Sequence, residues 1–176
     1  MRSGVVIQME VPHREPVRVR GFEFGDGRGV RSCAVVGSMR GNEVQQTFVC
    51  ARLVALLANL EHDGMLKAGK NVLVIPCVNP FSMNVQRRFW PQDRADINRS
   101  FPGDADGSTT ERIAAALLRV ARTFRYGIQL CSFNQRGDFL PHVRIARQGA
   151  ISERSAELAR DFGLPYVLLR APSPFD

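Results

Sequence analysis

The feature that most restricts the fold of this chain is the alternation of strand-like and helix-like segments from residue 30 onward. Residues 33–37 and 71–76 are short apolar runs, typical of strands that are buried on both faces. Between them, residues 42–60 repeat apolar side chains at helical spacing. A strand, a helix and a second strand predict a parallel pair with a helical crossover. The sequence therefore predicts an α/β fold with a mixed, largely parallel central sheet flanked by helices.

The later segments continue this alternation. Residues 108–111 form a capping box that opens a helix. Residues 126–131 predict a third buried strand, residues 152–163 a last helix that Ser152 caps, and residues 166–169 a fourth core strand. In the first predicted helix, one face carries Val44, Phe48, Ala51 and Ala55, with Val49, Leu53, Leu56 and Leu60 beside it.

The N-terminal region has a different pattern. Residues 5–11 and 17–24 alternate apolar and polar side chains, and a proline-containing segment separates them. This pattern predicts a β-hairpin or two neighbouring edge strands. We expect residues 1–29 to form strands packed on the edge of the domain, and residues 30–176 to form one incomplete α/β domain. Exposed edge strands also favour a homo-oligomer.

The basic charge of the chain does not indicate a nucleic-acid partner. The formal net charge is +7, but 22 of the 24 basic residues are arginines and they are scattered along the sequence, without a basic run. Dispersed arginines are more typical of codon bias, or of sites that recognise carboxylates through two parallel hydrogen bonds, than of a surface that binds a phosphate backbone. We therefore expect no nucleic-acid partner.

Membrane association and secretion are not expected either. No apolar run approaches the roughly 20 residues that a membrane-spanning helix needs, and the first residues lack the pattern of a signal peptide. The cysteines, at positions 33, 50, 77 and 131, have no CxxC spacing. They are typical of reduced, mostly buried thiols. We expect a cytoplasmic protein with no membrane partner.

Polar residues follow the predicted strands, at residues 39–43, 77–80 and 131–132. The irregular segment 79–106 adds further polar side chains: Arg87, Arg88, Asp96, Asn98 and Arg99. Ligands of open α/β sheets bind beyond the carboxyl ends of the strands, so we expect the functional site at this edge. The alternative is that these are ordinary solvated loop residues.

Four short blocks together resemble the succinylglutamate desuccinylase/aspartoacylase family, a branch of the zinc carboxypeptidase-like hydrolases. The blocks are GSMRGNE at 37–43, VNP at 78–80, DINRSFPG at 96–103 and PHVR at 141–144. The resemblance runs from about residue 30 to the C-terminus, and DINRSFPG is its most specific part. It implies a zinc carboxypeptidase-like fold, a single zinc ion, and hydrolysis of an N-acyl amino acid or a related amide.

The metal-ligand positions depart from the family pattern. The family holds zinc through the His and Glu of one block and the His of a DxH block. Glu43 matches the ligand carboxylate, but Arg40 replaces the first His and Cys131 the second, while Gln129 replaces the Asp of DxH. An arginine has no lone pair for a metal. Glu43 and a Cys131 thiolate are only two ligands, so the sequence predicts an absent or altered zinc site.

The residues implied to bind substrate are retained. Asn98 and Arg99 match the family pair that holds a substrate carboxylate, so the resemblance implies a small carboxylate-bearing ligand. Arg88, or the adjacent Arg87, matches the arginine that polarises the scissile carbonyl. Arg144, in the PHVR block, is expected to point into the pocket. A surface salt bridge is the ordinary alternative for each of these arginines.

Three functions stay open. The first is an impaired hydrolase with a retained carboxylate-binding cleft, in which Arg40 pairs with Glu43. The second is an active hydrolase with altered metal or cysteine chemistry, in which Cys131 is a nucleophile and His142 its base. The third is a non-catalytic interaction subunit. The family's general base is a Glu in a later strand, which residues 1–176 do not reach, so we expect a truncated chain or a second chain that supplies the remainder.

Overall fold

The computed structural model describes residues 1–11, 15–133, 137–146 and 153–170. The chain forms two compact units, Met1–Ser132 and Phe133–Asp176. The predicted boundary between residues 1–29 and 30–176 stays a prediction, although both N-terminal strands belong to the sheet of the first unit.

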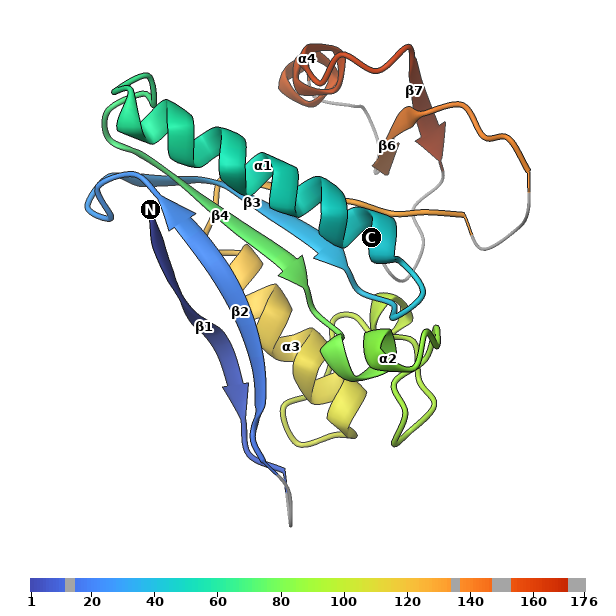
Figure 1. Ribbon diagram of the computed structural model, residues 1–176. Helices are drawn as coiled ribbons and strands as arrows, with labels where there is room; N and C mark the ends of the chain where they lie inside the picture. The colour runs from blue at the N-terminus through green and yellow to red at the C-terminus, as the bar shows by residue number, and fades with distance from the viewer. Residues whose placement is uncertain (12–14, 134–136, 147–152, 171–176) are drawn as a thin grey trace. The chain divides into compact units, whose positions relative to one another are not determined.

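The first unit contains a five-stranded sheet with the strand order β1-β2-β4-β3-β5 (Figure 1). The strands are β1 (Arg2–Met9), β2 (Val17–Phe24), β3 (Val30–Ser38), β4 (Lys70–Cys77) and β5 (Tyr126–Gln129). The β1–β2 and β2–β4 pairs are antiparallel, whereas β3 runs parallel to both β4 and β5. The predicted mixed α/β sheet and the predicted N-terminal hairpin are therefore confirmed.

Two helices cover opposite faces of this sheet: α1 (Val44–His62) and α3 (Thr109–Ala121). Successive residues of a strand point to opposite faces, and β3 follows this rule. Ala34 and Val36 join the core cluster that includes α3, whereas Val35 joins the cluster that includes α1. Both faces of the central strands are thus buried, as their continuous apolar runs predicted.

The start of α3 confirms the predicted capping box. The Ser108 hydroxyl accepts a hydrogen bond from the Glu111 backbone N–H, and the Glu111 carboxylate accepts one from the Ser108 N–H. These two bonds satisfy backbone donors that the first turn of a helix leaves without a partner.

The face of helix α1 that packs on the sheet is not the face that carries the apolar repeat from Val44 to Ala55. Its two fully buried residues are Gln46 and Cys50. Val44, Phe48, Ala51 and Ala55 are all exposed. The helix carries two apolar stripes, and the sheet takes the stripe of Leu53, Val54, Leu57 and Ala58. No helix in the described part of the chain is long and apolar enough to cross a membrane.

The second unit contains α4 (Glu153–Asp161) and two parallel strands, β6 (His142–Ala146) and β7 (Tyr166–Arg170). The predicted helix and last strand are present, but the predicted Ser152 cap lies outside the described residues. The prediction that residues 166–169 form a core strand was wrong. All four are exposed, because β7 pairs with β6 in a two-stranded sheet rather than between other strands. Strand β6 was not predicted.

Strand β5 also differs from its prediction as a strand buried on both faces. Its four residues alternate between half-buried and exposed, because β5 is the last strand of the five-stranded sheet.

The irregular segment after β4 is held in place by buried contacts. It contains the short helix α2 (Pro80–Asn84) and a 3-10 turn, η1 (Ile97–Arg99). Trp90 is fully buried and packs edge-to-face against Phe81. The Asp93 carboxylate accepts hydrogen bonds from the backbone N–H and the hydroxyl of Thr110, at 2.8 and 2.7 Å. These contacts fix the segment between α2 and α3.

Candidate functional site

The loops that follow β3 and β4 lie against each other at the carboxyl edge of the sheet (Figure 1). A Cβ atom on Gly41 would overlap the backbone of Ser82, so only glycine permits this approach of the β3–α1 loop to α2. Asn79, which is fully buried, begins α2: its Oδ1 accepts a hydrogen bond from the Ser82 N–H at 3.0 Å. These contacts therefore hold the two loops, and the residues beside them, in fixed positions.

Arg40 is buried at this edge between two carboxylates. Its Nε lies 3.1 and 3.0 Å from the two carboxylate oxygens of Asp96. Its Nη1 lies 3.4 Å from Oε1 of Glu43, and its backbone N–H donates to Oε2 of Glu43 at 3.3 Å. The predicted pairing of Arg40 with Glu43 is present in this geometry, and the contact with Asp96 is the shorter of the two.

Asp96 is the centre of this cluster, and its side chain is only 3% exposed. Arg88 donates to Oδ2 of Asp96 through Nε at 3.0 Å, and its Nη2 lies 2.9 Å from the same oxygen. The backbone N–H of Asn98 donates to Oδ1 at 3.1 Å. One carboxylate thus fixes two arginines, which lowers the cost of burying their charges.

Glu43 connects the cluster to the end of β5. Its side chain is 2% exposed. The hydroxyl and the backbone N–H of Ser132 donate to Oε1 of Glu43, at 3.4 and 3.5 Å. The Ser38 hydroxyl donates to the backbone carbonyl of Glu43. Arg40, Arg88, Glu43 and Asp96, here called the inner cluster, contribute two positive and two negative charges.

The two residues predicted to hold a substrate carboxylate lie at the outer side of the inner cluster. The Arg99 side chain is 64% exposed, and its Nε lies 4.0 Å from Oδ2 of Asp96. The Asn98 side-chain oxygen accepts a hydrogen bond from Nε2 of Gln129 at 2.6 Å. An exposed guanidinium beside an amide of fixed orientation can bind a carboxylate through two hydrogen bonds.

The candidate metal ligands do not gather into a metal centre among the described residues. Cys131 is exposed, and its Sγ lies 4.0 Å from the backbone oxygen of Gln129. Within the described ranges, no group of three or more His, Cys, Asp or Glu side chains is arranged to hold a metal ion. Glu43 instead has the Arg40 guanidinium as its charged partner.

Two further candidate arginines occupy other positions. Arg144 belongs to β6 of the second unit, where its Nε donates to Nε2 of His142 at 3.2 Å and its guanidinium lies over the Phe133 ring. Its predicted place in the pocket stays a prediction. Arg87 is exposed, and its backbone N–H donates to the Ser82 carbonyl. Of the pair at 87 and 88, Arg88 is the one that joins the inner cluster.

Cys33, Cys50 and Cys77 are free thiols, of which Cys50 is buried and the other two are half-buried. Burial raises the pKa of the Cys33 thiol above its ordinary value, and raises the pKa of Cys50 and of Cys77 to about 11. These three thiols therefore stay protonated at neutral pH, which suits a structural role.

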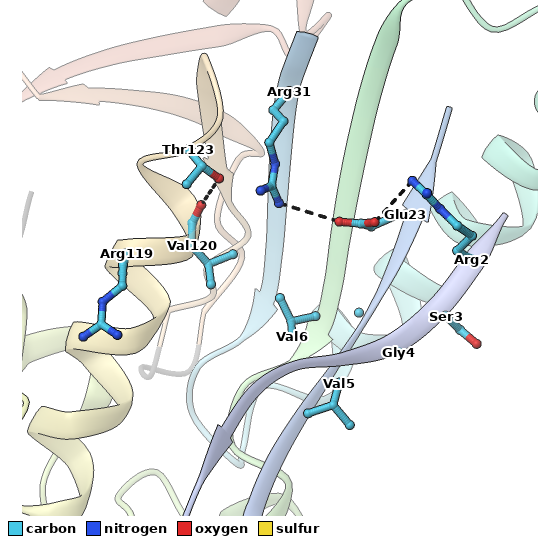
Figure 2. A pocket seen from close by; sticks show the side chains of 11 residues that line it. Arg2, Ser3, Gly4, Val5, Val6, Glu23, Arg31, Arg119, Val120 and Thr123 are labelled. Carbon is cyan, nitrogen blue, oxygen red and sulfur yellow. Dashed lines mark hydrogen bonds and ion pairs between the residues drawn. The ribbon is translucent and has the colours of Figure 1, made fainter. Parts of the chain in front are cut away.

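A groove of 460 Å³ lies elsewhere in the first unit, between β1 and α3 (Figure 2). Glu23 on its wall pairs with Arg2 at 3.4 Å and with Arg31 at 3.6 Å. No residue of the inner cluster lines this groove.

Sequence reasoning missed the roles of Asp96, Ser132 and Gln129. Asp96 precedes Asn98 by two residues, which is the spacing of a side chain that caps a turn, and its carboxylate does accept from the Asn98 N–H. That signal indicates a cap but not the two arginines. The contacts of Ser132 and Gln129 join residues 89 and 31 positions apart, which local patterns do not reveal.

Comparison with known proteins shows the family and the fold of the chain. The model of the succinylglutamate desuccinylase/aspartoacylase catalytic domain matches residues 30–175. The curated N-alpha-acetyl-L-2,4-diaminobutyric acid deacetylase of Halomonas elongata is 34% identical over 138 residues, which are 77% of this chain and 39% of that protein. The crystal structure of an aspartoacylase family protein from Mesorhizobium loti matches with a TM-score of 0.76 and 28% identity, over 96% of this chain and 52% of that one.

A more distant structure shares the fold. The metallo-carboxypeptidase from Burkholderia cenocepacia matches with a TM-score of 0.61 and 13% identity, over 89% of this chain and 46% of that one. The chain thus spans about half the length of the two solved structures, and less of the curated deacetylase.

Proposed function

Because this chain belongs to the succinylglutamate desuccinylase/aspartoacylase family of hydrolases, we propose that it binds a small carboxylate-bearing ligand of the N-acyl amino acid type, with an impaired zinc site. The observation that carries this proposal is the buried Arg40 guanidinium, held between Asp96 and Glu43. This guanidinium brings a positive charge to a position where the family resemblance implies a metal ligand.

The residues present do not fit the zinc ion of the family. Arg40 offers only N–H donors to its surroundings and has no lone pair to give to a metal ion. Its Nη1 lies 3.4 Å from Glu43, the one carboxylate that matches a family ligand. A zinc ion bound to Glu43 would have to displace this cation or share the carboxylate with it, and the two positive charges would repel each other.

The residues that match the family's carboxylate-binding pair also support the proposal. Arg99 presents an exposed guanidinium next to Asn98, and both residues lie in the segment that Asp96 anchors. Arg88 uses Nε and Nη2 to hold Asp96, and its other N–H groups can donate to a ligand carbonyl. Binding and orientation of the ligand are what these residues supply.

Calorimetric titration of the full chain with N-acetyl-L-asparagine tests the proposal. We expect Arg99→Ala to weaken binding by about tenfold or more, because a charge-assisted hydrogen-bond pair is lost. The exposed Arg52 of α1 gives the matched control, since Arg52→Ala removes the same charge outside this site. Equal affinities of the Arg99→Ala variant and the unmodified chain would contradict the proposal.

An interaction subunit is the second candidate, and one observation favours it. Helix α1 exposes Val44, Phe48 and Leu56, at 51%, 65% and 54% of their surface. Exposed apolar side chains on one helix are typical of surfaces that bind another protein. Sedimentation velocity of the unmodified chain and of the Phe48→Ser variant tests this candidate. The candidate requires that the unmodified chain associates and that the substitution weakens this association.

A further inference from the structure

We propose that the ligand of this site carries one carboxylate and no second anionic group, an inference that rests on the proposed function. The charged side chains beside the binding position support this inference. They are the four side chains of the inner cluster and Arg99, and ion pairs hold all five in place.

The inner cluster is electrically balanced by itself. Arg40 and Arg88 supply two positive charges, and Asp96 and Glu43 supply two negative ones, in contacts of 2.9 to 3.4 Å. The side chains of Arg40, Asp96 and Glu43 are all less than a tenth exposed. A ligand anion therefore meets a cluster that has no net charge.

Arg99 is the additional cation at the edge of the cluster. Its Nε is 4.0 Å from Oδ2 of Asp96, beyond hydrogen-bond distance, whereas Arg40 and Arg88 already contact that carboxylate at about 3 Å. The sum of the five charges is +1, and one carboxylate neutralises it. Among the described residues, no further cation pairs with the inner cluster. A second carboxylate would face the buried Asp96 and Glu43, and like charges repel.

Three described side chains beside the inner cluster are neutral and polar. Asn98 and Gln129 form an amide–amide hydrogen bond at 2.6 Å, and Ser132 contacts Glu43 through its hydroxyl. Amides and hydroxyls both donate and accept hydrogen bonds, which suits an uncharged polar group such as a carboxamide. Arg40 also supplies one positive charge, where a zinc ion would supply two, so the site is less cationic than one built around a metal.

An isosteric pair of ligands tests the inference. N-acetyl-L-asparagine and N-acetyl-L-aspartate have nearly the same shape, and differ by a carboxamide in place of a carboxylate. We expect calorimetric titration of the full chain to show that the asparagine compound binds at least as tightly as the aspartate compound. Tighter binding of the aspartate compound, by roughly fivefold or more, would overturn the inference.

A charge-changing variant gives a second and directional readout. Glu43→Gln keeps the size of the side chain and removes one buried negative charge, so the site gains one unit of positive charge. We expect it to shift the ratio of the two affinities toward the aspartate compound by roughly fivefold or more. Glu23→Gln makes the same charge change in the groove between β1 and α3, and is expected to leave the ratio unchanged.

The failure of the inference differs from the failure of the proposed function. If neither compound binds, or if Arg99→Ala leaves both affinities unchanged, the proposed carboxylate site is wrong and the inference is wrong with it. If Arg99→Ala weakens both compounds but the aspartate compound binds better, only the single-carboxylate inference is wrong. An unchanged ratio in Glu43→Gln also contradicts the inference.

Discussion

Nε of Arg40 lies 3.1 and 3.0 Å from the two carboxylate oxygens of Asp96, a residue 56 positions later in the chain. Their side chains are 9% and 3% exposed, so water screens this ion pair poorly. The pair joins the loop after β3 to the segment that carries Asn98 and Arg99. The Arg40–Asp96 pair of the candidate site is therefore also a structural link within the first unit.

We expect Arg40→Ala to lower the free energy of unfolding by about 3 kcal/mol, because Asp96 and Glu43 would stay buried with one cation fewer. Arg2→Ala breaks an exposed pair with Glu23 and should cost less than about 1 kcal/mol. Urea unfolding followed by circular dichroism measures both. If the two variants lose the same stability, the inner cluster does not stabilise the fold.

The Asp93–Thr110 contact is expected to fix the segment after α2. Asp93→Ala removes two acceptors from the fully buried Thr110, and should lower the free energy of unfolding by about 2 kcal/mol. Asp106→Ala, at an exposed position of the same segment, is the control and should change stability by less than about 0.5 kcal/mol. Thermal melts of both variants give the comparison, and equal melting temperatures would count against this role of Asp93.

Gln129 is expected to position the Asn98 amide for ligand binding. Gln129→Leu removes the 2.6 Å hydrogen bond, and should weaken the binding of N-acetyl-L-asparagine by about three- to tenfold. Gln129 is exposed, so the urea midpoint should stay unchanged. The exposed Gln45 of α1 provides the control substitution, Gln45→Leu. A loss of stability without a loss of affinity would assign Gln129 a purely structural role.

The buried thiols predict a loss of stability at alkaline pH. The pKa values of Cys50 and Cys77 are raised to about 11 in the folded chain, so unfolded thiols lose their protons at lower pH than folded ones. The unfolded state then binds fewer protons, and the free energy of unfolding falls as pH rises from about 9 to about 11. Urea midpoints across this range measure the fall. The Cys50→Ala/Cys77→Ala variant should show a shallower fall, and an equal slope would contradict the assignment.

Cys131 should differ from these thiols in its reaction with iodoacetamide. It is exposed, whereas Cys50 is buried and Cys33 and Cys77 are half-buried. At pH 8 we expect mass spectrometry to find Cys131 alkylated first. An alkylation rate far above that of a free cysteine would favour the nucleophile hypothesis, and an ordinary rate would disfavour it.

The sequence predicts the central part of the fold well, because its signals are local. The apolar runs at 33–37 and 71–76 lie within β3 and β4, and the capping box at 108–111 starts α3 as predicted. Each of these signals depends only on neighbouring residues. The strand at 166–169 was also recognised, but its burial depends on which strand lies beside it, and local pattern carries no such information.

The candidate site is less predictable for the same reason. The motifs identify Arg40, Glu43 and Arg99 as residues of one site. The structure places Arg40 and Arg99 beside Asp96, and Glu43 beside Arg40. The central role of Asp96 depends on contacts between distant segments. Helix α1 gives a second example: it has two apolar stripes, so periodicity alone does not show which stripe packs on the sheet.

The zinc content of the purified chain tests the central claim most directly. The unmodified chain is equilibrated with excess zinc, desalted, and analysed for metal per protein molecule. With Arg40 paired to Glu43, we predict fewer than about 0.1 zinc ions per chain. About one zinc ion per chain, lost in the Glu43→Ala variant, would contradict the account and restore a metal-dependent site.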